Sequence, residues 1–156
     1  LPYTTLFRSL GCADGRGHVV TTPADIDALP PLDPVCLVSQ STQFPDAYEE
    51  IARAVRRRFP DAVILQTICE ATRRRQSELV QLAAQVDVLV VVGGRNSANT
   101  LRLVELARSL KPTVQVETAD QLDLAALKAY AVAGLTAGAS TPDFVIDEVR
   151  RTLESL

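Results

Sequence analysis

The strongest constraint on the fold of this 156-residue chain is a unit that recurs along it: an apolar strand, a small polar loop and a helix. Three such loops, rich in Ser, Thr, Asn or Gly, cover residues 39–42, 93–100 and 136–143. A fourth apolar run, residues 62–65, leads instead to a loop that contains Cys69. Continuous apolar strands that alternate with helices are typical of parallel sheets covered on their faces. The sequence therefore predicts an α/β fold, with two small lobes of mainly parallel strands flanked by helices.

The apolar periodicity assigns each segment to a strand or a helix. Strands are predicted at residues 18–21, 35–38, 62–65, 87–92, 113–116 and 131–136, and helices at 23–28, 45–59, 72–86, 98–110, 122–128 and 142–156. Thr22 is the expected cap of the first of these helices. In the helix at 72–86, we expect four apolar side chains to face inward: Leu79, Val80, Ala83 and Val86. A border between domains is expected near residues 60–67.

Composition limits the kinds of partner. A hydrophobic content of 47% is ample for a core, and 16 basic against 19 acidic residues give a net charge of -3. This balance argues against nucleic acid or an anionic membrane as the main partner. Three widely spaced cysteines do not make a disulfide framework, which favours a reducing cytoplasm. No apolar stretch approaches the roughly 20 residues that span a bilayer.

The polar loops are candidate anion sites. Ends of parallel strands lie side by side, and helix N-termini present free N–H groups, so these loops together suit an anion such as phosphate. A purely structural alternative is that Ser97 or Asn96 only caps the next helix. Thr141 likewise fits a helix cap followed by Pro142, which leaves Ser140 free for another partner. The loop at 39–42 also fits ordinary turn chemistry.

Cys69 allows several interpretations. Five residues separate it from Arg75, as in the phosphate cradle of cysteine-dependent phosphatases. Glu70 would place a carboxylate in that cradle, no glycine lies between, and Ile68 stands where that family carries His. A thiolate at a helix start is instead a competent soft ligand for iron. A lone cysteine can also be inert packing.

The other candidate reactive side chains carry weaker signals. Cys36 lies within a predicted strand, so we expect it in the core, and Cys12 receives no role. His18, the only histidine, has no acidic or Ser partner in a recognisable pattern. We therefore expect His18 at the surface or at a sheet edge.

Taken in order, the motifs at residues 39–42, 67–76, 96–99 and 137–143 resemble those of the 4-hydroxy-3-methylbut-2-enyl diphosphate reductases, the LytB/IspH family. The resemblance runs from about residue 19 to the C-terminus. It implies three α/β lobes around a [4Fe-4S] cluster, with one cysteine ligand from each lobe. Residues 18–66 would be an incomplete second lobe and residues 67–156 the third, which carries the cluster cysteine. Residues 1–17 are expected to be a disordered or artefactual leader, since residues 2–9 look like translated sequencing-adapter DNA.

The resemblance also implies roles for individual residues. Cys69 would be the third cluster ligand, and the family's diphosphate-binding side chains match Ser97, Asn99 and Ser140. Ser41 and Thr72 would lie near the reacting end of the substrate. The implied reaction is the terminal step of the non-mevalonate isoprenoid pathway, in which the allylic alcohol is reduced to isopentenyl and dimethylallyl diphosphate. A ferredoxin or flavodoxin-type protein would donate the electrons, in the bacterial cytoplasm, without a nucleic acid or membrane partner.

The chain departs from the family pattern at several points. Ala98 stands where the family often has Ser, and Ser41 where Thr is common. The resemblance places the other two cluster cysteines, the substrate-facing histidines and the relay glutamate in a preceding segment. We therefore expect an upstream extension to contain them, and the chain alone to be inactive. The alternatives are a non-catalytic α/β module that binds a phosphate ligand and, more distantly, a cysteine phosphatase.

Overall fold

The computed structural model describes residues 10–156, which divide into two compact units. One unit ends at Arg73, and the other runs from Arg74 to Leu156. The division into lobes at 18–66 and 67–156 stays a prediction about the complete family fold. Of the predicted leader, residues 1–9 lie outside the described residues, while residues 10–12 are helical and lead into a turn.

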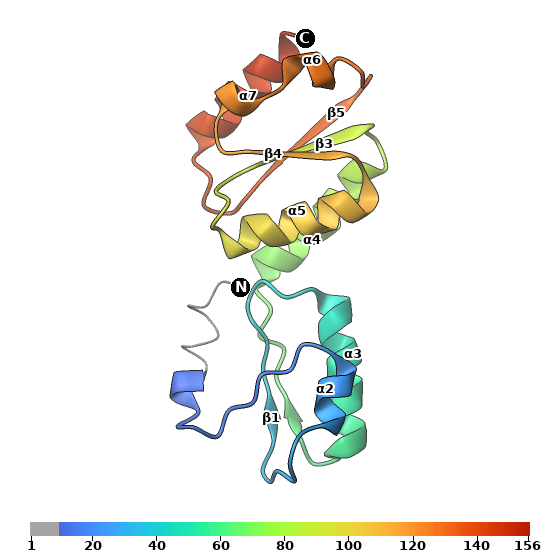
Figure 1. The fold of residues 1–156 in the computed structure, drawn as a ribbon, viewed down its shortest axis with the longest axis vertical. Helices are drawn as coiled ribbons and strands as arrows, with labels where there is room; N and C mark the ends of the chain where they lie inside the picture. Colours follow the sequence, from blue (N-terminus) through green and yellow to red (C-terminus); the bar gives the residue numbers. More distant parts are fainter. Residues whose placement is uncertain (1–9) are drawn as a thin grey trace. The chain divides into compact units, whose positions relative to one another are not determined.

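The first unit holds a two-stranded parallel sheet with α2 and α3 beside it (Figure 1). Its elements are α2 (Pro23–Asp27), β1 (Cys36–Leu37), α3 (Pro45–Arg58) and β2 (Val63–Ile64). Thr22 is the N-cap of α2, as predicted, and α3 begins at Pro45, as predicted. Cys36 pairs with Val63 and Leu37 with Ile64.

The core of this unit lies on one face of its sheet. Ile26 from α2 and Ile51, Ala54 and Val55 from α3 are buried there, packed against the inward side chains of both strands, among them Ile64. Because successive side chains of a strand point to opposite faces, the other face carries the exposed residues Cys36, Val38, Val63 and Leu65. The prediction that Cys36 is a core residue was therefore wrong: it alternates onto the face that α2 and α3 do not cover.

The second unit has a three-stranded parallel sheet with helices on both faces (Figure 1). After α4 (Glu70–Ala83), which begins in the first unit, come β3 (Val88–Val92), α5 (Ala98–Leu110), β4 (Thr113–Val116), the 3₁₀ turn η1 (Ala119–Gln121), α6 (Leu124–Leu127), β5 (Ala133–Ala137) and α7 (Asp143–Glu154). The strand order is β4-β3-β5. The observed bounds of α5 and β4 match the predicted ones.

Strand β3 is the centre of this unit, and all five of its residues are buried. Leu89 and Val91 face α4 and α5, whereas Val88, Val90 and Val92 face η1, α6 and α7. A central parallel strand buried on both faces explains why this segment reads as an uninterrupted apolar run. The predicted α/β class with parallel sheets flanked by helices is confirmed.

Three further predicted features of the fold differ from the structure. Residues 18–21 have no regular secondary structure, although their valines have strand propensity. Val80 is 47% exposed, because the inward stripe of α4 passes through Leu79 and Ala83. The predicted helix at 122–128 is shortened to α6, which begins at Leu124 because the Asp123 carboxylate caps it by accepting from the N–H of Ala126. None of the helices described for residues 10–156 is long and apolar enough to cross a membrane.

Candidate functional site

The polar loops of the second unit begin at the same edge of its sheet. Val92 at the end of β3 pairs with Ala137 at the end of β5. The loop after β3 leads to α5, a helix of 13 residues, and the loop after β5 leads to α7. Parallel register therefore brings together the two loops that contain Ser97, Asn99 and Ser140. The free N–H groups at the start of α5 add positive partial charge at that edge.

Ser97 is the N-cap of α5, and its Oγ accepts a hydrogen bond from the N–H of Thr100 at 3.3 Å. The capping interpretation is confirmed for Ser97. This bond uses a lone pair of the hydroxyl oxygen, so the O–H group remains available to donate. Asn99 Nδ2 is buried and, among the described residues, has no hydrogen-bond partner. Both side chains therefore keep a donor for which a bound anion would supply the acceptor.

Thr141 is turned toward the sheet. Its hydroxyl donates to the carbonyl of Val92 at 3.1 Å, and the N-cap of α7 is Pro142. The prediction that Thr141 caps α7 was wrong, because this hydroxyl bonds a strand carbonyl instead. Ser140, one residue earlier, is exposed. Its hydroxyl is thus accessible to a ligand at the sheet edge.

Two side chains in and directly after β4 form hydrogen bonds with the backbone of the loop that precedes α5. Gln115 Nε2 donates to the Gly93 carbonyl at 3.3 Å, and the Arg95 N–H donates to Glu117 Oε1 at 2.8 Å. Neither Gln115 nor Glu117 was singled out from the sequence. The available signal was their position at the end of a third parallel strand, where polar side chains reach the same loops.

In the first unit, the loops after β1 and β2 are joined by side-chain and backbone hydrogen bonds. Thr67 Oγ1 accepts from the Ser39 N–H at 2.7 Å and donates to the Ser39 carbonyl at 2.7 Å. Two residues further along each loop, the Cys69 N–H donates to the Ser41 carbonyl at 3.0 Å. Ser41 and Cys69 are therefore neighbours, and both are exposed.

Cys69 immediately precedes α4, and its carbonyl accepts the N–H groups of Thr72 and Arg73 at 3.0 and 3.1 Å. Thr72 is buried, with 7% of its surface exposed. Arg75 belongs to the same helix, so the residues between Cys69 and Arg75 are helical and form no phosphate cradle. The structure thus disfavours the cysteine phosphatase.

A metal centre at the loops of the first unit would have one cysteine thiol, that of Cys69, as a ligand. All three cysteines are free, and Cys69 is the one placed beside Ser41 and the start of α4. Among residues 10–156, no three His, Cys, Asp or Glu side chains are grouped so that they could hold a metal ion. Cys69 could therefore serve as one ligand of an iron-sulfur cluster, but the described residues do not supply a complete set of cluster ligands.

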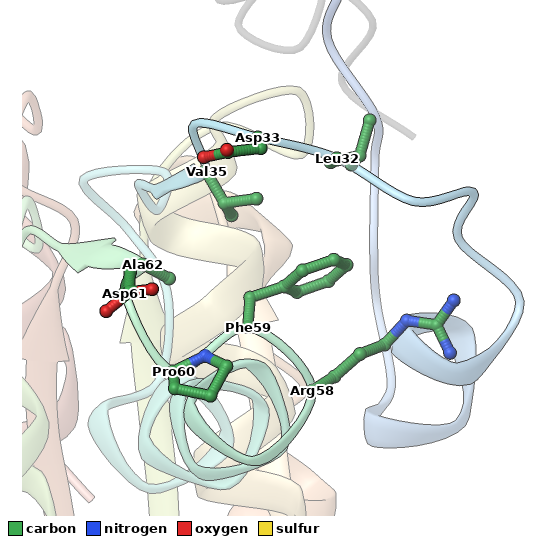
Figure 2. Close-up of a pocket in the computed structure, with 8 residues that line it drawn as sticks. All are labelled: Leu32, Asp33, Val35, Arg58, Phe59, Pro60, Asp61 and Ala62. Carbon is green, nitrogen blue, oxygen red and sulfur yellow. The ribbon is translucent and has the colours of Figure 1, made fainter.

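A pocket in the first unit lies away from these loops (Figure 2). Val35 and Ala62, which precede β1 and β2, line it, whereas Ser41 and Cys69 follow the other ends of these strands. The Arg58 guanidinium lies 5.4 Å from the centre of the Phe59 ring and donates to the Leu29 carbonyl. Its cation is already engaged, so this pocket is not the candidate site.

The predicted site residues thus fall into two groups, one in each unit. Ser41, Cys69 and Thr72 belong to the first unit, and Ser97, Asn99 and Ser140 belong to the second. The expectation from the family resemblance that all six lie around one substrate and its cluster stays a prediction.

A family model described as "LytB protein" matches residues 8–154 of the chain. A 4-hydroxy-3-methylbut-2-enyl diphosphate reductase of Opitutus terrae is 48% identical over 149 residues, which cover 94% of this chain and 52% of that protein. The reductase of the same name from Oleidesulfovibrio alaskensis is 54% identical over 122 residues, 77% of this chain and 43% of that protein. The chain thus spans about half the length of these curated relatives.

Solved structures show the same likeness. The E-1-hydroxy-2-methyl-but-2-enyl-4-diphosphate reductase of Plasmodium falciparum superposes with a TM-score of 0.75 at 30% identity, covering 89% of this chain and 44% of that one. A second structure, described as (E)-4-hydroxy-3-methyl-but-2-enyl diphosphate reductase, the terminal enzyme of the non-mevalonate pathway, gives a TM-score of 0.57 at 34% identity. It covers 94% of this chain and 53% of that one.

Proposed function

The chain belongs to the LytB family, and on that premise we propose that it supplies the diphosphate-binding side chains and one cluster cysteine of a 4-hydroxy-3-methylbut-2-enyl diphosphate reductase. The observation that carries the proposal is the common sheet edge of the loops that hold Ser97, Asn99 and Ser140. Ser41, Thr72 and Cys69 would serve the reacting end of the substrate.

The second unit would bind the diphosphate with neutral donors. The Ser97 hydroxyl, the Asn99 carboxamide and the exposed Ser140 hydroxyl each have a donor to offer, beside the N-terminus of α5. Hydrogen bonds to a charged group are about twice as strong as neutral ones, so a few such donors can hold a diphosphate without Lys or Arg. The nearby Glu117 carboxylate already accepts a hydrogen bond from the Arg95 N–H, and this bond offsets part of its negative charge.

The first unit would supply Cys69 as one thiolate ligand of an iron-sulfur cluster, whose chemistry is electron transfer to the bound substrate. The exposed thiol fits that role, and its place is fixed by the bond from the Cys69 N–H to the Ser41 carbonyl. The same contact brings Ser41 close to the cluster ligand. The remaining ligands would come from the part of its relatives' length that this chain does not span.

In the proposed reaction, an allylic alcohol takes up two electrons and two protons and loses water, giving isopentenyl or dimethylallyl diphosphate. A ferredoxin or flavodoxin-type protein would supply the electrons in the bacterial cytoplasm. The diphosphate is unchanged, so the second unit would hold and orient the substrate without taking part in bond breaking.

The diphosphate site is tested with inorganic diphosphate as the probe in calorimetric titrations of the 156-residue chain. Ser97→Ala and Ser140→Ala should each cost about 1.5–3 kcal/mol of binding free energy, because each removes a hydrogen bond to a charged ligand.

The matched control is Ser109→Ala, at the far end of α5, where the hydroxyl donates to the Leu106 carbonyl. It should leave the affinity for diphosphate unchanged. Equal affinities for Ser97→Ala, Ser140→Ala and the unchanged chain would remove the assignment.

The second candidate is a non-catalytic module that binds a phosphate ligand. It is favoured by one observation: the described residues bring a single suitably placed thiol and no metal-binding group. Both candidates predict diphosphate binding. Iron and sulfide analysis under anaerobic conditions separates them when it is made on the chain extended to the length of its relatives, since only a reductase needs the cluster.

A further inference from the structure

Thr100, in the first turn of α5, lies between the two polar loops of the second unit. Its side chain is completely buried. A Cβ atom placed on Gly138 would lie 2.2 Å from Thr100 Oγ1, and one placed on Gly93 would lie 2.7 Å from the same oxygen. These two glycines directly follow Val92 and Ala137, the last paired residues of β3 and β5. Thr100 therefore contacts both loops at the point where they leave the sheet.

Packing, and not hydrogen bonding, fixes the Thr100 hydroxyl. Within the described chain, Thr100 Oγ1 has no hydrogen-bond partner. The backbone around it is held by other bonds: the Gly138 N–H and the Thr141 hydroxyl both donate to the Val92 carbonyl, at 2.9 and 3.1 Å. The side chain of Thr100 thus acts as a spacer in a closely packed junction.

We propose that Thr100 is a positioning residue, which sets the spacing between the loop that carries Ser97 and Asn99 and the loop that carries Ser140. The inference rests on the proposed diphosphate site. Donors on two separate loops can bind one ligand together only if their spacing is fixed before the ligand arrives. Gly93 and Gly138 are then glycines because a Cβ at either position would collide with this spacer.

Gly93 and Gly138 differ in a way that permits a clean test. Gly93 has φ of +148°, a backbone conformation that side chains rarely adopt, so its substitution is strained for a second reason. The backbone of Gly138 lies outside that region, and the first obstacle to a Cβ there is Thr100 Oγ1. Removal of that oxygen should therefore make room for the added methyl group at position 138.

The experiment is a double-mutant cycle on the full 156-residue chain, with inorganic diphosphate as the probe and affinity and thermal midpoint as readouts. Gly138→Ala alone should weaken diphosphate binding about tenfold or more, because the collision moves the loops apart. In the double variant Gly138→Ala/Thr100→Ala, the affinity for diphosphate should recover to within about threefold of that of the unchanged chain. A double variant that binds as weakly as Gly138→Ala would overturn the inference.

Two further variants separate positioning from stability. Thr100→Val places a bulkier methyl group against Gly138 and should weaken diphosphate binding about tenfold. Thr100→Ser keeps the oxygen, and its affinity for diphosphate should stay within about twofold of that of the unchanged chain. If Gly138→Ala fails to fold, the comparison of Thr100→Val with Thr100→Ser tests the inference instead. Equal affinities of these two variants for diphosphate would overturn it. Val104→Ala, buried against α4 and β3, should lower the thermal midpoint and leave the affinity unchanged.

The proposed function and this inference fail in different ways. If Ser97→Ala binds diphosphate as tightly as the unchanged chain, the diphosphate site is absent and the inference falls with it. If Ser97→Ala weakens binding but the double variant shows no recovery, the site stands and the positioning role of Thr100 falls alone.

Discussion

At the scale of single residues, the Asp25 carboxylate shows how one side chain fixes a helix start. Its Oδ2 accepts the backbone N–H groups of Thr21 and Thr22, at 2.7 and 2.8 Å, and the Thr21 hydroxyl at 2.9 Å. These bonds, the backbone bond from Thr21 first among them, lower the pKa of Asp25 to about 2. The charged form is favoured because all three groups donate to it.

The lowered pKa of Asp25 predicts a pH dependence of stability. Between its ordinary pKa of 3.8 and about 2, the unfolded chain binds more protons than the folded one. The contribution of Asp25 is therefore complete above pH 4 and disappears as the pH falls toward 2. In thermal melts, Asp25→Asn should remove this part of the acid destabilisation, while Asp27→Asn, at the other end of α2, should retain it. Parallel pH profiles for Asp25→Asn and the unchanged chain would contradict the prediction.

Residue patterns predicted the candidate donors but not their partners. Ser97 was identified both as a cap and as an anion ligand, and its oxygen serves the cap. Thr141 was assigned to the wrong partner, since the choice between a helix N–H and the Val92 carbonyl depends on a strand 49 residues away. No separate role was predicted for Thr100 within the polar loop at 93–100, because its role depends on two glycines from different loops.

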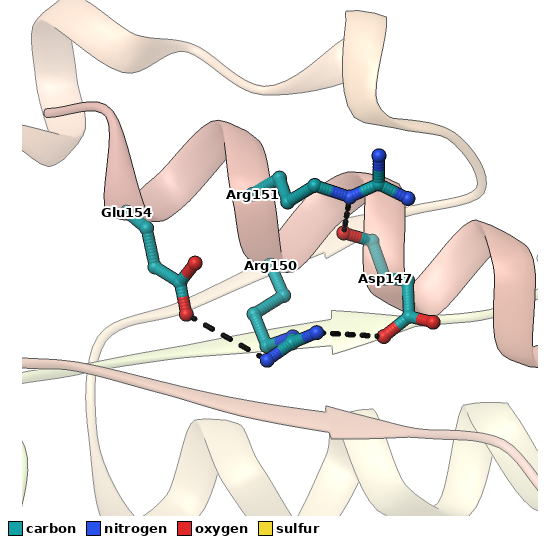
Figure 3. Close-up of polar contacts among 4 residues, drawn as sticks. All are labelled: Asp147, Arg150, Arg151 and Glu154. Carbon is teal, nitrogen blue, oxygen red and sulfur yellow. Dashed lines mark hydrogen bonds and ion pairs between the residues drawn. The ribbon is translucent and has the colours of Figure 1, made fainter.

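At the scale of elements, α7 separates its stabilising face from its solvated face. Figure 3 shows the solvated face, where Arg150 lies between Asp147 and Glu154, at 3.1 and 3.9 Å. Exposed pairs at such spacings contribute only about 0.2–0.5 kcal/mol each. Val149, in contrast, is fully buried among residues that cover β3.

We therefore expect substitutions on the two faces of α7 to differ in their effect. Val149→Ala should lower the free energy of unfolding by about 2 kcal/mol, through lost burial and the cavity left behind. Arg150→Ala should change it by less than about 0.5 kcal/mol. Urea unfolding of both variants measures this difference. Equal losses would show that the ion pairs of α7 contribute as much as its core contact.

Local periodicity predicted most elements, because helix and strand patterns need only neighbours in the sequence. The bounds of α5 and β4 follow from an apolar stripe and an apolar run between breaking residues. The failure at residues 18–21 has the opposite cause, since a strand exists only where a neighbouring strand pairs with it. Cys36 was misplaced for a related reason: an apolar strand does not reveal which of its faces is covered.

At the scale of the whole molecule, the ligand count of a cluster can be tested directly. An iron-sulfur cluster held by one thiolate should be weakly bound, because its stability comes from several ligands that bind together. Anaerobic reconstitution of the 156-residue chain should therefore give no stable iron-sulfur absorbance. Cys69→Ser serves as the control, and its spectrum should equal that of the unchanged chain. A robust absorbance that disappears in Cys69→Ser would show that the chain holds a cluster by itself.

The sequence alone determined the alternation of strands and helices, the parallel α/β class and the family, because these depend on periodicity and on motifs in a fixed order. It also indicated which loops carry donors. Only the tertiary structure decided that β3 and β5 end in register, that Thr141 bonds Val92 and that Thr100 separates the two loops. Those contacts join residues far apart in the chain, so their geometry depends on strand register and side-chain packing, which no local pattern encodes.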